Sequence, residues 1–396
     1  MVVRSRLLLA GIALVLVAAA VIVFVVVSNR PSGGPTPSAA PPDDGAGLRI
    51  TAFLGEQRIA PATTLAGTTF GGISGLDRDG DTWFLVSDDR SAKQPARFYT
   101  AGLAFGGPDG ALSGVEVTGS HPFLRPDGAP YPPLAGGDGT TVDPEDIRVD
   151  PRTKQLVWSQ EGERVLPTDG KPAVLIDPTV RIADRDGKFV RELPVLDDLK
   201  PTTGERGIRQ NNGPEGLTFS ADGEQILLAI EDPLLQDGPL PTRTTGAVTR
   251  IVVLSRDGRL RAQHAYPLEP LFADPTTSGA ATTGITAILA EPDSPSRYLV
   301  LERSFAPGVG NKVRLYEIDL AGAADIGTGP IAAAAPVTKH LITDVGTLPV
   351  QSVDNIEGMT WGPDRPDGSH TLVLVSDDNF SPEQVTQFVA VAVRPA

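Results

Sequence analysis

From residue 48 onward, apolar residues come in short runs bounded by turn residues, which is typical of β-strands rather than long helices. Five segments share one order of features: a short opening motif, an apolar strand, a turn, a second apolar strand, and then acidic residues. Aligned on one position in the opening motif, the segments are spaced by 71, 70, 71 and 71 residues. The aligned positions are Ser74, Glu145, Glu215, Thr286 and Glu357. Such a period indicates one supersecondary unit used five times.

Each unit holds enough strand pattern for a four-stranded sheet. Asp-Gly pairs at 79–80, 222–223 and 367–368 lie between the first two strands, as hairpin turns do. A second strand pair often follows, for example 248–254 with 260–266. Four strands in about 70 residues is the content of a β-propeller blade with generous loops. We therefore predict an all-β propeller with five countable units and five or six blades. Residues 48–59 complete the last blade, because ring closure removes exposed sheet edges.

The first 47 residues have a different character. Arg4 and Arg6 precede an uninterrupted apolar run of 21 residues, from Leu7 to Val27, which as a helix spans one hydrocarbon core. We predict a signal-anchor in residues 1–30, with the N-terminus in the cytoplasm. Residues 31–47 read PSGGPTPSAAPPDDGAG, a flexible linker, and residues 48–396 form the propeller. This places the protein in the cell membrane with one span and an extracytoplasmic domain. Cleavage of the first segment would make it a secreted protein.

Charge and composition exclude several classes of function. The net charge of −15 argues against nucleic-acid binding, which needs a basic surface. The chain has no cysteine, so disulfides, thiolate zinc sites and cysteine nucleophiles are excluded. Only four histidines occur, and none lies in the opening motifs or the acidic ends of the repeats, which are expected to share one face. There is no G-x-S-x-G motif, so a serine-hydrolase mechanism has little support.

The acidic residues of the repeats should gather on one face of the propeller. Because the first two strands of a blade are antiparallel, the start of the first lies beside the end of the second. The expected neighbours are Ser74 with Asp88, Glu145 with Glu161, Glu215 with Glu231, Thr286 with Glu302, and Glu357 with Asp377. If the first strand is innermost, these groups surround the mouth of the central channel.

Crowded carboxylates repel one another, and a hard cation such as calcium removes that cost. We therefore predict a calcium site. Its candidate ligands are Glu145, Glu215, Glu231, Glu357, Asp377, Asp378 and Asn379. The alternative is structural: each Glu caps backbone groups at a blade junction and each Asp closes a turn.

Several motifs resemble one known family. GPEGLTFSADGEQILLAIED, NIEGMTW and LVLVSDDNF are similar to the phytase-like domain family, also described as "esterase-like activity of phytase". That family also has a motif like GGISGLD and an Arg-Asn-rich stretch, here GIRQNNGPEGL. The resemblance covers about residues 70–385 and touches Glu215, Glu357, Asp377 and Asn379. It implies a propeller fold and hydrolysis of ester or phosphoester bonds.

Two hypotheses follow from these observations. The first is a calcium-dependent esterase or phosphoesterase acting on a small molecule, in which Arg90, Arg209 and Arg303 bind the substrate's phosphate. These arginines alternatively pair with the neighbouring acids. The second hypothesis is a non-catalytic propeller that binds a protein, a glycan or a cell-wall ligand, since a fold does not fix a function. A lactonase-like hydrolase is a third, weaker option. The residue pattern assigns no catalytic residue.

Overall fold

The computed structural model describes residues 47–107, 109–135, 139–194, 196–328, 331 and 334–396. The predicted signal-anchor and nearly all of the predicted linker lie outside these described residues. Within the described part of the chain, no helix is long and apolar enough to cross a membrane.

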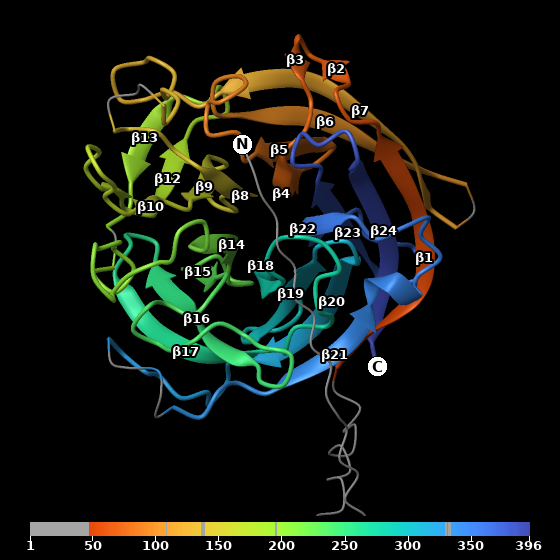
Figure 1. The fold of residues 1–396 in the computed structure, drawn as a ribbon. Helices are drawn as coiled ribbons and strands as arrows, with labels where there is room; N and C mark the ends of the chain where they lie inside the picture. The colour runs from red at the N-terminus through yellow and green to blue at the C-terminus, as the bar shows by residue number, and fades with distance from the viewer. Residues whose placement is uncertain (1–46, 108, 136–138, 195, 329–330, 332–333) are drawn as a thin grey trace, which may run out of the picture. The chain divides into compact units, whose positions relative to one another are not determined.

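Five four-stranded antiparallel sheets stand around a common centre, as Figure 1 shows. Blade 1 contains β4 (Ile73–Asp79), β5 (Thr82–Ser87), β6 (Arg97–Gly106) and β7 (Ala111–Pro122). Blade 2 contains β8 (Pro144–Val149), β9 (Leu156–Gln160), β12 (Thr179–Ala183) and β13 (Phe189–Glu192). Blade 3 contains β14 (Pro214–Phe219), β15 (Gln225–Ile230), β16 (Ala247–Ser255) and β17 (Leu260–Leu268).

Blade 4 contains β18 (Thr282–Ala290), β19 (Arg297–Ala306), β20 (Gly310–Asp319) and β21 (Lys339–Asp344). Blade 5 contains β22 (Asn355–Trp361), β23 (His370–Asp377), β24 (Thr386–Pro395) and β1 (Leu48–Ile59). The loops also contain two short two-stranded ribbons and one 3₁₀ turn. The ribbons are β2 (Thr64–Leu65) with β3 (Thr68–Thr69) and β10 (Glu163–Val165) with β11 (Val174–Ile176), and the turn is η2 (Val345–Thr347). The chain is therefore an all-β propeller with five blades, and no sixth blade lies among the described residues.

The ring closes between the two ends of the domain. Strand β1 pairs with β24 along its whole length, from Leu48 opposite Pro395 to Ile59 opposite Thr386. In Figure 1 the orange-red β1 lies beside the dark blue β24. The prediction that 48–59 completes the last blade is confirmed. Because β24 runs away from the funnel face described below, Leu48 lies at the opposite face.

The hydrophobic core is divided among the blade junctions. Five clusters of buried apolar side chains fill the spaces between blades 5 and 1, 1 and 2, 2 and 3, 3 and 4, and 4 and 5. The inner strands of blades 2 to 5 are almost wholly buried on both faces, which explains the near-continuous apolar runs in those repeats. The first strand of each unit is innermost, as predicted, and each inner strand contacts those of the neighbouring blades.

Candidate functional site

The position on which the five repeats align is a β-bulge in every inner strand. In β14 the ladder passes from Pro214 directly to Gly216, so Glu215 has no partner on β15. The ladders of β4, β8, β18 and β22 break at the same place. A bulge changes the direction of a side chain, which in a regular ladder would alternate between the two faces of the sheet. Glu145, Glu215 and Glu357 reach the central hollow from these positions.

One residue at or near the end of each second strand belongs to another ring of side chains beside the bulge residues. Each of these residues lies opposite the residue two positions before the bulge; for example, the amide of Glu231 donates to the carbonyl of Gly213. The five members of this ring are Asp88, Glu161, Glu231, Arg303 and Asp377. Four blades therefore contribute an acid, and blade 4 contributes an arginine.

Repeat spacing predicts Glu302 for this ring, and that prediction is wrong. The pair before the bulge is 16 residues apart in blades 2 and 3 (Pro144 with Gln160, Pro214 with Ile230) but 17 apart in blade 4 (Ile285 with Glu302). A shift of one residue turns a strand's side chains to the other face. Glu302 therefore points away from the centre, where Tyr266 Oη donates to it at 2.8 Å and Lys339 forms an ion pair with it.

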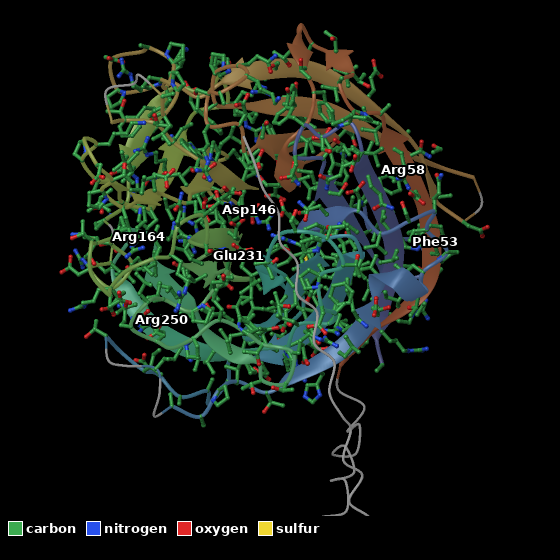
Figure 2. The ribbon with its side chains drawn as sticks, in the orientation of Figure 1. Phe53, Arg58, Asp146, Arg164, Glu231 and Arg250 are labelled. Carbon is green, nitrogen blue, oxygen red and sulfur yellow. The ribbon has the colours of Figure 1, made fainter. Side chains whose placement is uncertain are left out.

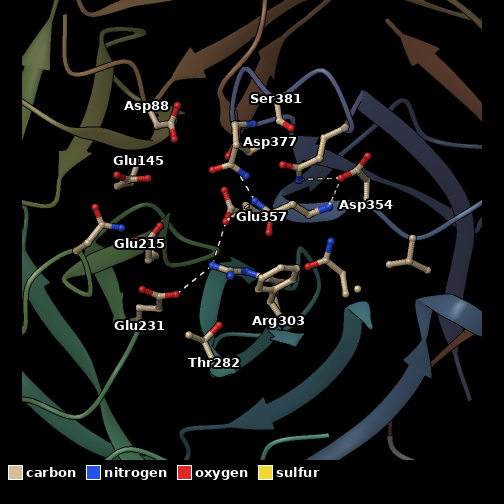
Figure 3. A pocket seen from close by; sticks show the side chains of 18 of the residues that line it. Asp88, Glu145, Glu215, Glu231, Thr282, Arg303, Asp354, Glu357, Asp377 and Ser381 are labelled. Atoms are coloured by element: carbon tan, nitrogen blue, oxygen red, sulfur yellow. Dashed lines mark hydrogen bonds and ion pairs between the residues drawn. The ribbon is translucent and has the colours of Figure 1, made fainter. Parts of the chain in front are cut away.

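The two rings form a funnel with a volume of about 750 Å³ at one end of the central channel. Besides Asp354 and Glu383, which line it outside the two rings, eight carboxylates of the described residues gather in it: Asp88, Asp143, Glu145, Glu161, Glu215, Glu231, Glu357 and Asp377. All are buried except that Asp88 is partly exposed. Figure 3 shows several of them converging on the same space from different blades. The closeness of Glu145 to Glu161 and of Glu215 to Glu231 is confirmed.

Two arginines enter this acidic space. Arg303 Nη2 lies 3.1 Å from both Glu231 and Glu357, so it bridges blades 3 and 5 (Figure 3). Arg90 pairs with Asp143 at 2.6 Å and with Glu163 at 3.0 Å. Both arginines line the funnel while they are fixed by acids. Both arginines therefore pair with neighbouring acids, as the alternative prediction for them expected.

Burial and mutual repulsion disturb the protonation of the funnel acids. Burial, followed by the charges of Glu231 and Glu161, holds the pKa of Glu215 well above its ordinary value. Burial and then the charge of Glu357 do the same to the pKa of Asp377. Burial also raises the pKa of Glu231 and of Glu357, although Arg303 opposes the rise in both cases. The funnel is thus short of positive charge.

The oxygen atoms are arranged in two overlapping groups. Asp143, Glu145 and Glu161 each place a carboxylate oxygen within 4.8 Å of the others, and so do Glu161, Glu215 and Glu231. Glu161 is fully buried, and its Oε2 atom accepts no hydrogen bond; the nearest cation, Arg90 Nη2, is 3.6 Å away. Asn211, Asn212 and Asn379 also line the funnel. Clustered carboxylates and amide oxygens are the donor set that calcium takes, so the residues present fit that ion.

Two of the predicted site residues lie elsewhere. Arg209 does not line the funnel, because its guanidinium donates to the carbonyls of Pro233 at 2.9 Å and Gly238 at 2.7 Å and so holds a loop of blade 3. Asp378 lies outside the lining, and its Oδ1 accepts from the amides of Gly72 and Phe380. This is the structural capping role that was the alternative. Asn379 lines the funnel from a left-handed backbone conformation, φ 47°.

Sequence reasoning missed Asp143 as a site residue. It lies two positions before the bulge residue Glu145, as Asn355 lies two positions before Glu357. The corresponding position in blade 3 is Gly213, where a Cβ atom would lie 2.6 Å from the carbonyl oxygen of Glu161. The polar residue two positions before the bulge in units two and five was the sequence signal that could have identified Asp143 as a site residue.

A buried arginine closes the channel below the funnel. The guanidinium of Arg148 donates to the carbonyls of Leu217, Leu76 and Ile288, which belong to blades 3, 1 and 4, and to Asp146 at 3.0 Å. Figure 2 places Asp146 and Glu231 near the centre of the ring. Beyond Arg148, a second hollow of about 360 Å³ opens on the opposite face, lined by Asp77, Asp79, Phe219 and Trp361 among others.

These features define a class: a five-bladed propeller with an acidic funnel at one end of its channel. A family described as "Phytase-like: Esterase-like activity of phytase" matches residues 68–380. The chain belongs to this phytase-like family, and the resemblance seen in the repeat motifs is confirmed. A search of curated protein sequences gives no match.

Several solved structures match the chain at low identity, three of which follow. A GH43 β-1,3-galactosidase with galactodeoxynojirimycin is 12% identical, with a TM-score of 0.43 over 85% of this chain and 95% of that one. A glucose dehydrogenase is 12% identical, with a TM-score of 0.36 over 85% and 99%. A gluconolactonase from Xanthomonas campestris is 14% identical, with a TM-score of 0.29 over 85% and 99%.

Proposed function

We propose that this protein is a membrane-anchored, extracytoplasmic, calcium-dependent esterase or phosphoesterase. The observation that carries the proposal is the imbalance of charge in the funnel. Among the described residues, eight carboxylates lie in or next to its two rings and two arginines pair with them, while the fully buried Glu161 has a carboxylate oxygen that accepts no hydrogen bond. An enclosed site of this kind is stable at neutral pH when a divalent cation supplies the missing charge.

The chain's own residues would divide the work in the funnel. Asp143, Glu145, Glu161, Glu215 and Glu231 would hold the ion, with Glu357 and Asp377 beside them. A bound calcium ion supplies a Lewis acid that polarises an ester or phosphoryl oxygen and lowers the pKa of a bound water. Arg303 and Arg90 offer charged N–H donors on opposite sides of the funnel, and these donors suit phosphate oxygens. Both arginines stay in place before substrate arrives because acids already hold them.

Membrane attachment is the other part of the proposal. The predicted anchor lies in residues 1–30, and the described domain begins at the face opposite the funnel, where Leu48 pairs with Pro395. Protease added to intact cells is expected to remove the propeller while leaving a short membrane-bound fragment. Recovery of the whole chain in the cytosol would contradict this arrangement.

The function is tested by assaying the full-length chain, purified in a non-ionic detergent, with p-nitrophenyl phosphate and p-nitrophenyl acetate. We expect turnover in calcium and none in chelator. Glu357→Gln should lower turnover by at least about 10-fold, because it removes a carboxylate from the site. Asp79→Asn, the same chemical change at the opposite end of the channel, should retain turnover. Calcium binding without turnover of either ester would contradict the proposed enzymatic activity and favour a non-catalytic binding propeller.

A further inference from the structure

In blade 4 the two innermost strands continue past the rings of the funnel, whereas the two innermost strands of the other blades stop at them. Strands β5, β9 and β15 end one residue before their ring residues, and β23 ends at its own, Asp377. In blade 4, β19 continues three residues past Arg303 to Ala306, and its ladder with β20 runs to the pair Ala306–Gly310. Strand β18 likewise begins two residues before Gly284, the partner of Arg303. Paired strands therefore form a wall on this side of the funnel.

The wall presents a distinct set of side chains to the funnel. Residues two apart on a strand share a face, so Phe305 lies above Arg303 on β19. The ladder places Thr282 and Asn311 directly beside Phe305, on β18 and β20. All four residues line the funnel. Of the seven large apolar side chains exposed among the described residues, Phe305 alone lines it, with 37% of its surface exposed.

The side of the wall that faces away from the funnel is buried and held by hydrogen bonds, so the wall is rigid. Thr283 and Ser304 face away from the funnel, are buried, and share a hydrogen bond of 2.8 Å between their hydroxyl groups. Ala306 is fully buried. The amide of Thr276 donates to the carbonyl of Pro307 at 2.9 Å, which ties the hairpin tip to the loop before β18. Binding groups on rigid strands hold a ligand more accurately than groups on free loops.

The wall gives the funnel two chemically different sides. Blades 1, 2, 3 and 5 supply the acids, together with Arg90 and Arg58, while blade 4 supplies to the lining a cation with an aromatic ring above it, flanked by a hydroxyl and an amide. We infer that the blade 4 wall is the subsite for the organic part of the substrate, and that this part presents the face of an aromatic or sugar ring to Phe305. This inference rests on the proposed function, in which the anionic part of the substrate binds deeper, beside Arg303. The polar neighbours Thr282 and Asn311 would face the edge of the ring.

The subsite is tested with two unreactive probes, phenylphosphonate and methylphosphonate, titrated calorimetrically into the full-length, calcium-loaded chain. Because both probes share the anionic group, the ratio of their affinities isolates the contribution of the ring. We expect the wild-type chain to bind the phenyl probe roughly 5- to 10-fold more tightly, as an aromatic contact of ordinary strength gives. Phe305→Ala should abolish that preference and leave methylphosphonate affinity within about twofold. The control Leu341→Ala, an exposed apolar residue outside the funnel, should change neither affinity.

The possible outcomes separate this inference from the proposed function. Equal affinities for the two probes, no binding of either, or a preference that survives Phe305→Ala would overturn the subsite. Calcium-dependent turnover of p-nitrophenyl phosphate in the same samples would then still support the enzyme. A phenyl preference that Phe305→Ala abolishes, without any turnover, would sustain the subsite and contradict the esterase. Because Phe305 is partly exposed, the variant should fold, and a thermal melt followed by circular dichroism checks this.

Discussion

The two ends of the central channel use carboxylates in different ways. At the end opposite the funnel, each acid has partners: Asp77 accepts from Val149 N and from Thr360 Oγ1, and Asp79 pairs with Lys154 and Arg185. At the funnel end, the eight acids in or next to the rings share two arginines, Arg90 and Arg303, among the described residues. The same residue type therefore serves the fold at one end, while at the other it leaves a charge that the fold does not balance. The number of partners that the acids have is therefore more informative about a binding site than the number of acids.

Arg148 marks the boundary between the two ends, and removing it should have the largest effect. Its side chain is only 3% exposed and ties inner strands of three other blades through their carbonyls. We expect Arg148→Met to lower the free energy of unfolding by about 3–5 kcal/mol, because it leaves Asp146 buried without its cation. Urea unfolding measures the change. The control Lys188→Met removes an exposed ion pair with Asp186 and should cost under about 1 kcal/mol. Equal losses in the two variants would contradict the role of Arg148.

Calcium should stabilise the protein through the funnel end alone. At a concentration 100 times its dissociation constant, a ligand that binds only the folded state adds about 2.7 kcal/mol. We expect Glu215→Gln to remove most of this gain and Asp79→Asn to keep it. Thermal melts in calcium and in chelator measure the difference for each variant. A calcium effect that is lost in Asp79→Asn but kept in Glu215→Gln would place the ion at the end opposite the funnel and contradict the prediction.

The stability of the calcium-free protein should fall as pH rises from about 4 to about 7. Burial raises the pKa of Asp146 to about 7, and burial with neighbouring charges holds those of Glu145 and Glu161 well above their ordinary values. The folded state then keeps protons that the unfolded state, with carboxyl pKa values near 4, releases. Raising the pH through this window therefore favours unfolding. Melts in chelator should give a higher melting temperature at pH 5 than at pH 7.5, and calcium should reduce the decline. A calcium-free melting temperature that rises across this window would contradict the account.

The smallest predicted effect has the opposite sign from an ordinary core substitution. In chelator at pH 7.5, Glu215→Gln should raise the free energy of unfolding by about 1 kcal/mol, because a neutral amide replaces a buried acid that its neighbours repel. Asp79→Asn should instead lower it slightly, since an exposed ion pair contributes at most about 1 kcal/mol. Guanidinium titrations of the two variants with the wild type give the signs. Destabilisation by Glu215→Gln would indicate that this carboxylate is already satisfied without an ion.

Most of the fold could be predicted from the sequence because the repeat is regular and each blade is local. The near-constant spacing identified the units, the Asp-Gly turns located the hairpins, and the unpaired pattern of residues 48–59 identified the closing strand. The number of blades follows once the strand that closes the ring is known. The predictions of the repeat units and of the closing strand both depended on distances along the chain, which the sequence contains directly.

The candidate site could be predicted only in part, because it depends on register. Glu145, Glu215, Glu231, Glu357 and Asp377 do meet in the funnel. Equal spacing nevertheless suggested Glu302 where the longer hairpin of blade 4 places Arg303. A one-residue change in a turn cannot be read from apolar patterning, yet it decides which side chain faces the channel. Arg209 and Asp378 follow the same rule: their motifs reach the right face, while their side chains point to nearby backbone.

Calorimetric titration of calcium into the full-length chain is the most direct test of the claim that the unbalanced acids of the funnel bind calcium. We expect saturable binding to the wild type and to Asp79→Asn with equal affinity, and binding at least about 10-fold weaker in Glu215→Gln. Absence of binding to the wild type, or binding that Glu215→Gln leaves unchanged, would contradict the claim and return the funnel acids to a purely structural role.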